Sequence, residues 1–286
     1  VLGVAVVQLN FLVNVNVASG LPVGSLTAIT LGFTIMTMPQ IVIAQAISVA
    51  AMPTFSAQAA RGELNELRSS LTSTIRGILA LSLPAAIGLI LLRTPIMGML
   101  FERGAFTEAS TELAAAALLW YTVGLVSHSL LEILSRAFYA LQDTKTPVTI
   151  GVLAMSLNVL FSLTFPALFS RIGLMPLGGL AFANSLATTI EVIILLILMR
   201  RRLNGIEGKH LLSGATKIVI ASVLMSTSLI VWLGLAGENY LVTSIIGVAI
   251  GVLVYSLCLI GLRLEEVQQA LRAAQRRIGR FFNKAT

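Results

Sequence analysis

Amide and hydroxyl side chains interrupt the apolar runs of this sequence at helical spacing. Asn10 and Asn14 are four residues apart, so they would share one helix face and could line a polar cavity or coordinate a cation. Asn158 and Ser162 repeat that spacing, and Asn184 follows in a later run. Such oxygen atoms suit hard cations, although the amides could equally hydrogen-bond neighbouring helices. We therefore expect either a cation site or a polar interface between helices.

Glu191 is the most conspicuous charge within an apolar run. It precedes Arg200 by nine residues, about 14 Å of helix, which places it near the middle of a membrane. Carboxylates at that depth are typical of proton or ion relays. We predict a coupling role for Glu191, with a purely structural role as the alternative.

A stripe of hydroxyl groups marks the second apolar run. Four threonines follow a 3-4-3 spacing, which puts them on one helix face: Thr27, Thr30, Thr34 and Thr37. Threonines often bond back to their own helix, but this stripe could also face a hydrated path. We predict a substrate cavity lined by polar groups of the first two spans, namely Asn10, Asn14, Thr30, Thr34 and Thr37.

Other polar residues are interpreted as structural. Glu132 and Arg136 are four residues apart and are expected to pair. His128, one turn earlier, is interpreted as a packed histidine. The small residues around Asn184 predict close helix packing: Gly178, Gly179, Ala181, Ala183 and Ser185.

The elements that must position these residues are long apolar segments. The 286 residues are 57% hydrophobic and 11% charged, whereas a soluble domain carries about a quarter charged residues. No phosphate-cradling glycine loop, paired histidine ligands or nucleophile elbow occurs, so we do not expect an enzyme. We predict an all-α polytopic membrane protein with eight spans at 1–19, 25–52, 73–93, 110–138, 147–168, 177–199, 213–235 and 241–262.

Prolines and polar segments set the expected boundaries of the early spans. Pro39 predicts a kink within the second span, and Pro53 is expected just past its end. The polar stretch 61–68 is expected to form a short surface helix before the third span. A fourth span is expected at 110–138.

The basic residues are distributed unequally between the two sides of the predicted membrane. Sixteen of the nineteen Lys and Arg residues fall on one side, and the other side holds Arg93, Arg103 and Arg171. The positive-inside rule then places the start of the chain and its C-terminus in the cytoplasm. Membrane orientation explains the net charge of +7 better than binding to nucleic acid.

The two ends of the chain have their own patterns. Residues 263–286 combine an apolar helical stripe with basic residues beside it, which predicts an amphipathic helix at the cytoplasmic membrane surface. The alternative is a solvated basic end. The chain begins at Val1 within a hydrophobic run, without a basic leader, so we expect a piece of a longer protein and no signal peptide.

The stretch Ser135–Val148, which reads SRAFYALQDTKTPV, predicts a tight cytoplasmic connection between two helices, with Asp143 and Thr144 capping the second helix. It closely resembles the hallmark of the MurJ/MviN lipid II flippase family, within the multidrug/oligosaccharidyl-lipid/polysaccharide exporter superfamily. The stretches LFERGAF at 100–106, YTVGL at 121–125 and AAMPTFS at 50–56 support the resemblance.

The resemblance implies fourteen spans in two lobes, of which this chain is similar to the last eight. Residues 1–200 would form a six-helix carboxy-terminal lobe, 201–262 two additional helices with a lipid-tail groove, and 263–286 a basic cytoplasmic tail. It implies translocation of lipid II by alternating access across the bacterial cytoplasmic membrane. The implied partners are this lipid-linked peptidoglycan precursor, membrane lipids and an amino-terminal lobe; no other cofactor than a coupling ion is expected.

Two departures from the family pattern leave alternatives open. Family members often carry a cavity arginine where this chain has Thr34. The resemblance also implies a sodium site at Asn14, Asn158, Ser162 and Asn184. None of these residues is a carboxylate. Glu191 could therefore supply a different coupling charge, for example by binding a proton. The alternatives are an exporter of another lipid-linked oligosaccharide, a drug/cation antiporter, or a truncated product that does not transport.

Overall fold

The computed structural model describes residues 12–237 and 239–262, and these residues fold almost entirely into helices. A helix covering residues 12–19 comes first. The others follow in the order α2 (Ser25–Gln40), the π-helical turn η1 (Ile41–Gln45), α3 (Ala46–Ala60), α4 (Leu64–Leu91), α5 (Arg93–Phe101), α6 (Glu108–Thr122), α7 (Leu125–Ala140), α8 (Lys145–Arg171), α9 (Pro176–Arg202), α10 (Gly208–Leu235) and α11 (Tyr240–Gly261).

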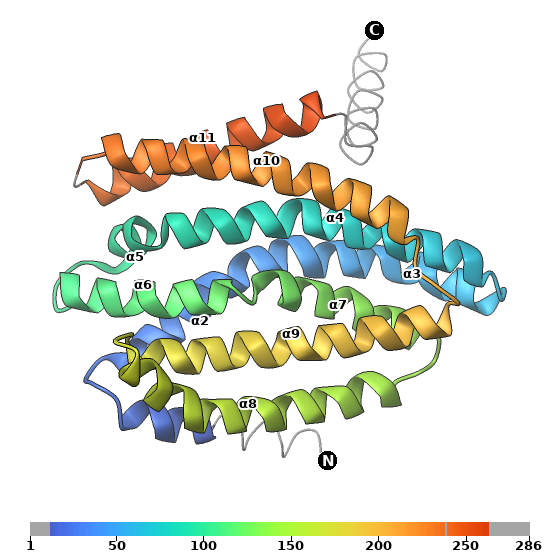
Figure 1. Cartoon of the computed structure of the whole chain (residues 1–286), viewed down its shortest axis with the longest axis horizontal. Helices are drawn as coiled ribbons and strands as arrows, with labels where there is room; N and C mark the ends of the chain where they lie inside the picture. Colours follow the sequence, from blue (N-terminus) through green and yellow to red (C-terminus); the bar gives the residue numbers. More distant parts are fainter. Residues whose placement is uncertain (1–11, 238, 263–286) are drawn as a thin grey trace, which may run out of the picture.

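The helices run side by side along the long axis of the molecule (Figure 1). α8 and α9 pair closely on one side, and α6 and α7 pack on the inner face of α9. α2 packs on α6, and α4 on α7. On the opposite side, α10 packs on α4 and α11 packs on α5 and α10. The predicted site residues of α8 and α9 therefore lie between this side of the bundle and its middle.

The described helices confirm the prediction of an all-α polytopic membrane protein. Six continuous helical segments are long and apolar enough to cross a membrane, and α6 with α7 would make a seventh span. The six are Ser25–Ala60, Leu64–Leu91, Lys145–Arg171, Pro176–Arg202, Leu212–Leu235 and Tyr240–Gly261. Most of the first expected span, and the whole tail 263–286, lie outside the described residues.

The second span is longer than expected. Its helix turns π-helical at Ile41–Gln45, just after Pro39, and continues as one segment from Ser25 to Ala60. The kink predicted at Pro39 stays a prediction. The prediction that the helix ends before Pro53 was wrong, because α3 continues to Ala60. Phe55 lies in a buried cluster with Leu67 and Leu71 of α4, and this packing stabilises the helix beyond the proline.

Two further boundaries differ from the prediction. The stretch 61–68 does not form a separate surface helix: a turn at Gly62, with φ of 72°, leads directly into α4. Leu67 and Leu71 are buried there, so the polar stretch is the first part of a spanning helix. The span expected at 110–138 is broken into α6 and α7, which meet at 44°.

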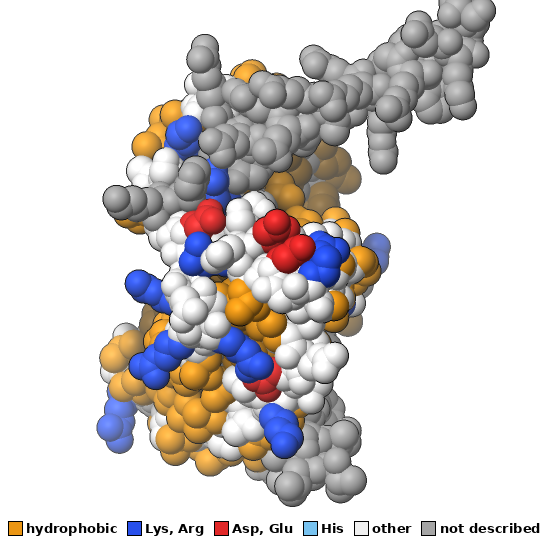
Figure 2. Space-filling view, turned by 90° about the vertical axis from the view of Figure 1, so that its right-hand side faces the viewer, with side chains coloured by type: hydrophobic (Ala, Val, Ile, Leu, Met, Phe, Trp, Pro, Cys, Tyr) orange, Lys and Arg blue, Asp and Glu red, His pale blue; other side chains and the backbone are white. Residues whose placement is uncertain are grey.

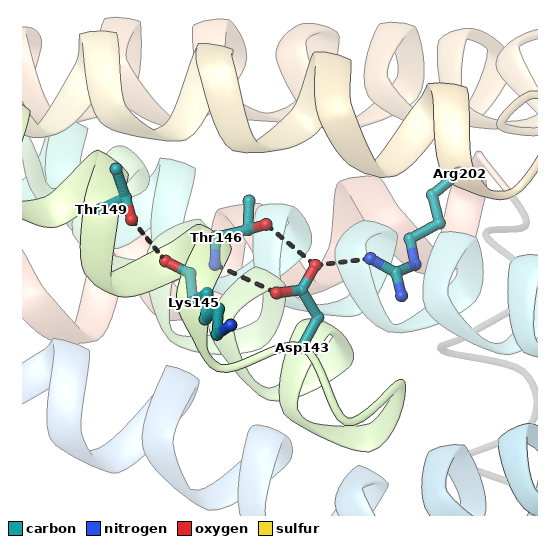
Figure 3. A network of polar contacts seen from close by, with 5 residues as sticks. All are labelled: Asp143, Lys145, Thr146, Thr149 and Arg202. Carbon is teal, nitrogen blue, oxygen red and sulfur yellow. Dashed lines mark hydrogen bonds and ion pairs between the residues drawn. The ribbon is translucent and has the colours of Figure 1, made fainter.

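The connection between α7 and α8 is the tight turn that the sequence predicts (Figure 3). Asp143 accepts hydrogen bonds from the backbone N–H of Thr146 at 3.0 Å and from its hydroxyl at 2.8 Å. Thr144 occupies the N-cap position without a side-chain cap bond, so Asp143 alone does the capping. Arg202, at the end of α9, also binds the Asp143 carboxylate.

The loops expected on one side of the membrane lie at the same end of the molecule. The turns at 61–63, 141–144 and 203–207 share the right-hand end of Figure 1. Figure 2 shows Lys and Arg side chains spread over this end with few acidic ones. The exposed basic residues in or directly beside these turns include Arg61, Lys145, Arg200, Arg201 and Arg202.

Candidate functional site

Asn14, Asn158 and Ser162 meet where the first helix contacts α8. The hydroxyl of Ser162 donates to Asn14 Oδ1 at 3.0 Å and lies 3.5 Å from Asn158 Oδ1. The amide of Asn14 donates to Asn158 Oδ1 at 3.4 Å. Asn158 and Ser162 are buried. We call these three residues the amide set; they bring side-chain oxygens from two helices together.

Pro166 gives the amide set one more feature. A helical residue at position 166 would donate its N–H to the Ser162 carbonyl, and proline has no N–H to give. A backbone carbonyl of the kind that hard cations bind therefore belongs to one of the three residues. Asn10, the other polar residue predicted on this face, lies outside the described residues.

Asn184, the fourth residue of the predicted sodium site, has different partners. Its Oδ1 lies 3.0 Å from Nε2 of His128 on α7, and Thr188 Oγ1 lies 3.4 Å from the same nitrogen. The sequence neighbours of His128 and Thr188 also interact: the hydroxyls of Ser127 and Thr189 lie 2.9 Å apart. α7 and α9 are thus held together by a row of polar side chains, in which His128 is central.

Ser185 explains why the helix can break between α6 and α7. Its hydroxyl donates at 2.7 Å to the carbonyl of Trp120 and lies 3.2 Å from that of Tyr121. At the break the N–H of Gly124 donates to the Tyr121 carbonyl at 2.9 Å rather than to the Trp120 carbonyl, and a buried carbonyl without a donor is costly. A Cβ added at Gly124 would lie 2.8 Å from Ser185 Cα, so glycine allows α9 to approach the break.

A cavity of about 210 Å³ lies between α7, α8 and α9. Both asparagines, Asn158 and Asn184, line it, so it separates the amide set from the His128 interface. Its remaining lining residues are His128, Leu131, Ala154, Met155, Ala187, Thr188 and Glu191. The predicted site residues of α8 and α9 therefore face one cavity, although they do not form one hydrogen-bonded cluster.

Glu191 enters this cavity from α9, one turn beyond Thr188. Its side chain is partly buried, and a Cβ added at Gly151 of α8 would lie 3.3 Å from Glu191 Oε1. Gly151 therefore provides the space for the carboxylate. The expected pair of Glu132 with Arg136 is confirmed, with Arg136 Nη2 2.6 Å from Glu132 Oε1.

The threonine stripe of α2 bonds back to its own helix. Thr30 donates to the Leu26 carbonyl at 2.9 Å, and Thr34 to the Thr30 carbonyl at 2.8 Å. Thr37 bonds to Thr34 in the same way. Thr27, Thr30 and Thr34 are exposed in this chain, so the other described helices do not cover this face of α2.

A second, apolar cavity of about 460 Å³ lies on the opposite side of the bundle. α4 contributes Pro84 and Gly88, and α11 contributes Gly251 and Tyr255. Met225 and Leu229 of α10, and Pro39 of α2, also line it. We call this space the apolar groove; its walls suit a hydrocarbon chain more than a charged group.

Comparison with known proteins identifies the family. The family model described as "Lipid II flippase MurJ" matches residues 1–260. Among curated relatives, the probable lipid II flippase MurJ of Vibrio cholerae is 28% identical over 94% of this chain and 52% of its own length. The corresponding protein of Thermotoga maritima is 33% identical over 94% and 52%. The chain thus spans about half the length of these relatives.

Comparison with solved structures points to the same family. A lipid II flippase MurJ in an inward closed conformation has a TM-score of 0.74 and 26% identity, over 92% of this chain and 52% of the other. An outward-facing multidrug resistance MATE family transporter of the MOP superfamily, at TM-score 0.58 and 20% identity, shares the fold. Proteins of this kind are transporters rather than enzymes. The resemblance read from the sequence is therefore confirmed, and the chain belongs to the MurJ lipid II flippase family.

Proposed function

We propose that this chain forms the carboxy-terminal part of a transporter that moves lipid II from the cytoplasmic to the outer leaflet. The observation that carries the proposal is the family match over residues 1–260. In this proposal an amino-terminal lobe completes the transporter, residues 1–200 form the second lobe, and 201–262 are two additional helices. The tail 263–286 lies at the cytoplasmic surface.

The exposed threonine face of α2 supports a hydrated path between the lobes. Thr30 and Thr34 satisfy their own hydroxyl protons within the helix, which leaves oxygen lone pairs for water or a polar headgroup. A charged headgroup crosses a membrane at low cost only if water or polar groups surround it. Alternating access between two lobes would supply that environment from each side in turn.

The apolar groove supports a place for the lipid tail. Its walls come from the lobe through α4 and from the two additional helices through Met225, Leu229 and Tyr255. A polyprenyl-type chain gains from contact with such a surface as much as from contact with lipid. In this proposal the groove holds the tail while the headgroup passes between the lobes.

Orientation and coupling complete the proposal. By the positive-inside rule, the basic end shown in Figure 2 faces the cytoplasm, as does the C-terminus. In a Cys258→Ser background, Arg61→Cys should react with an impermeant thiol reagent from the cytoplasmic side, and Ala105→Cys from the other side.

The amide set is the candidate sodium site, and Glu191 is the candidate coupling carboxylate.

The test of the function is growth after depletion of a native flippase. A full-length protein that includes this chain should restore growth. Thr34→Trp should abolish the rescue because it fills the open face of α2, whereas Thr216→Trp should not. Thr216 is the matched control: it is exposed on α10 and bonds back to the Leu212 carbonyl in the same manner. Failure of the unmodified protein to restore growth would contradict the proposal.

A second candidate function is favoured by Thr34, which stands where the family often has a cavity arginine. Without that positive charge, the substrate of the full protein would be another lipid-linked oligosaccharide or a drug exchanged for a cation. Reconstituted vesicles distinguish the two: the second candidate predicts transport that does not depend on peptidoglycan precursor. Movement of substrate by the isolated 286 residues would exclude the alternative of a product that does not transport.

A further inference from the structure

We propose that the cavity between α7, α8 and α9 is a proton-binding site formed by Glu191 and His128, separate from the amide set. Glu191 supplies the carboxylate from α9, against Gly151 of α8. His128 supplies the imidazole from α7, held at 3.0 Å by Asn184. The cavity of about 210 Å³ between them has room for several water molecules that could carry a proton from one group to the other.

The surroundings of Glu191 favour a neutral carboxyl group. The described residues that line the cavity include no Lys or Arg. A carboxylate at membrane depth is costly unless it is paired, hydrated or neutralised. These lining residues offer no fixed cation, so the carboxylate is either hydrated within the cavity or neutralised by a mobile cation. When a proton binds to a Glu191 oxygen, the charge of the carboxyl group goes from −1 to zero.

The other oxygen atoms of the cavity favour a proton over a metal cation. Asn184 Oδ1 lies against His128 Nε2, and Asn158 Oδ1 is bonded within the amide set. The carboxylate of Glu191 and the hydroxyl of Thr188 remain among the described lining residues. Hard cations bind about six oxygens, so water would have to supply most of the ligands of a metal cation here, whereas a proton needs one oxygen.

His128 is oriented to exchange that proton. Because Nε2 faces the carbonyl oxygen of Asn184, the tautomer that fits carries its hydrogen on Nε2. Nδ1 is then the nitrogen with a lone pair. The cavity walls of the described chain therefore hold two titratable groups, Glu191 and His128, on facing helices.

The other charged groups of the surrounding helices lie elsewhere. Glu132, one turn from His128 on α7, is ion-paired with Arg136. The described part of α8 has charged side chains at its ends, in Lys145 and Arg171, and α9 has Arg200–Arg202 at its end. α6 carries Glu108 and Glu112 in its first turns and the phenol of Tyr121 near its end, and α2 carries no charged residue. α4, which packs on α7, carries Glu66 and Arg68 in its first turns and Arg76 against Gly214 of α10.

An aromatic contact connects the site to the open face of α2. The ring of Phe33 meets His128 edge to face at 6.4 Å and Tyr121 at 5.2 Å. Phe33 is 39% exposed and directly precedes Thr34. Proton binding at His128 would change the charge beside the Phe33 ring and so would act on the helix that faces the substrate path. This consequence rests on the proposed transport function; proton binding itself does not.

Infrared difference spectroscopy of the purified chain in lipid nanodiscs tests the proposal. As the pH is lowered, the wild type should gain the C=O band of a protonated carboxyl group, and Glu191→Gln should lose one component of that band. Glu132→Gln is the control, because it removes a carboxylate that is paired with Arg136; it should keep that component. Superimposable spectra of the wild type and Glu191→Gln would overturn the proposal.

Two more measurements keep the result decisive. If Glu191→Gln does not fold, Gly151→Ala retains both titratable groups and places a methyl group against the carboxyl, so the same component should change frequency; an unmoved component would contradict the site. Replacing potassium by sodium at fixed pH should leave the component unchanged, and a sodium-induced loss would identify a sodium site instead. Neither measurement needs lipid II. If the chain binds the proton but the full-length protein that includes it does not restore growth, the flippase proposal alone is rejected.

Discussion

The hydroxyl of Tyr255 on α11 donates a 2.6 Å hydrogen bond to the carbonyl oxygen of Ala80 on α4. Pro84 lies four residues after Ala80 and has no N–H to donate to that carbonyl. α11 therefore supplies from its side chain the hydrogen bond that the proline removes from α4. The same two residues, Pro84 and Tyr255, line the apolar groove, so the bond also fixes one of its walls.

The first prediction is that Tyr255→Phe destabilises the protein through this carbonyl. The free energy of unfolding in lipid or detergent should fall by about 1 kcal/mol, because the buried oxygen loses its donor. In a Pro84→Ala background the loss should be smaller, since an alanine at that position would restore the N–H within the helix. Tyr139→Phe is the control, because Tyr139 is exposed and its change should have little effect. Equal losses in both backgrounds would contradict this account.

The membrane spans could be predicted from the sequence because apolar runs of about twenty residues seldom form anything other than membrane-spanning helices. Pro53 shows the limit of local signals: the helix passes through it because Phe55 packs on α4, and that contact is not visible in the sequence. The break between α6 and α7 was missed for the same reason. Gly124 alone does not predict the break. The hydrogen-bond donor that satisfies the Trp120 carbonyl at the break is Ser185, which lies 61 residues after Gly124, on α9.

The candidate site was predicted in part. Four-residue spacing put Asn158 and Ser162 on one face, and the structure brings Asn14 to them. Asn184 was grouped with them, but the rotation of α9 relative to α7 turns its amide toward His128. Side-chain direction on a helix can be read from spacing, whereas its partner depends on how two helices pack. A histidine within an apolar run was the signal available for His128.

The second prediction concerns pH and Asp143. The N–H and hydroxyl of Thr146, with a smaller contribution from Arg202, hold the pKa of Asp143 below its usual value. A folded-state pKa below the unfolded one, which is about 3.9, stabilises the ionised form. This contribution is complete at neutral pH and is lost as the pH falls from about 4 through the lowered folded-state pKa. Wild type should therefore be more stable than Asp143→Asn at pH 7, and the difference should shrink in acid.

A variant at Arg202 separates the causes of this effect. Because the bonds from Thr146 contribute most, Arg202→Leu should retain most of the pH dependence of stability. The measurement is denaturant unfolding of wild type, Asp143→Asn and Arg202→Leu between neutral and acid pH. A difference between wild type and Asp143→Asn that is the same at every pH would show that the carboxylate charge has no role in the turn.

The third prediction concerns the close approach of α8 and α9. A Cβ added at Gly179 would lie 2.6 Å from the carbonyl carbon of Phe165 and 2.7 Å from the nitrogen of Pro166. These are backbone atoms, so Gly179→Ala must push the helices apart and should cost about 1–3 kcal/mol of stability. Gly77→Ala is the control, because a Cβ there meets nothing within 4 Å; it should be neutral or slightly stabilising. Equal stability of the two variants would mean that the helices can separate freely.

The fourth prediction concerns cation binding by the amide set. Asn14, Asn158 and Ser162 offer oxygens without a formal negative charge, and a neutral site binds hard cations weakly. Asn14→Asp keeps the size of the side chain and adds that charge beside the hydroxyl of Ser162.

Sodium should therefore raise the midpoint of thermal unfolding of Asn14→Asp more than that of wild type, since a ligand that binds the folded state stabilises it. Choline at the same ionic strength corrects for screening. Asn16→Asp is the matched control: Asn16 is exposed on the same helix and lies outside the amide set, so its variant should respond to sodium as wild type does. An equal response of Asn14→Asp and Asn16→Asp would mean that the three oxygens do not form a cation site.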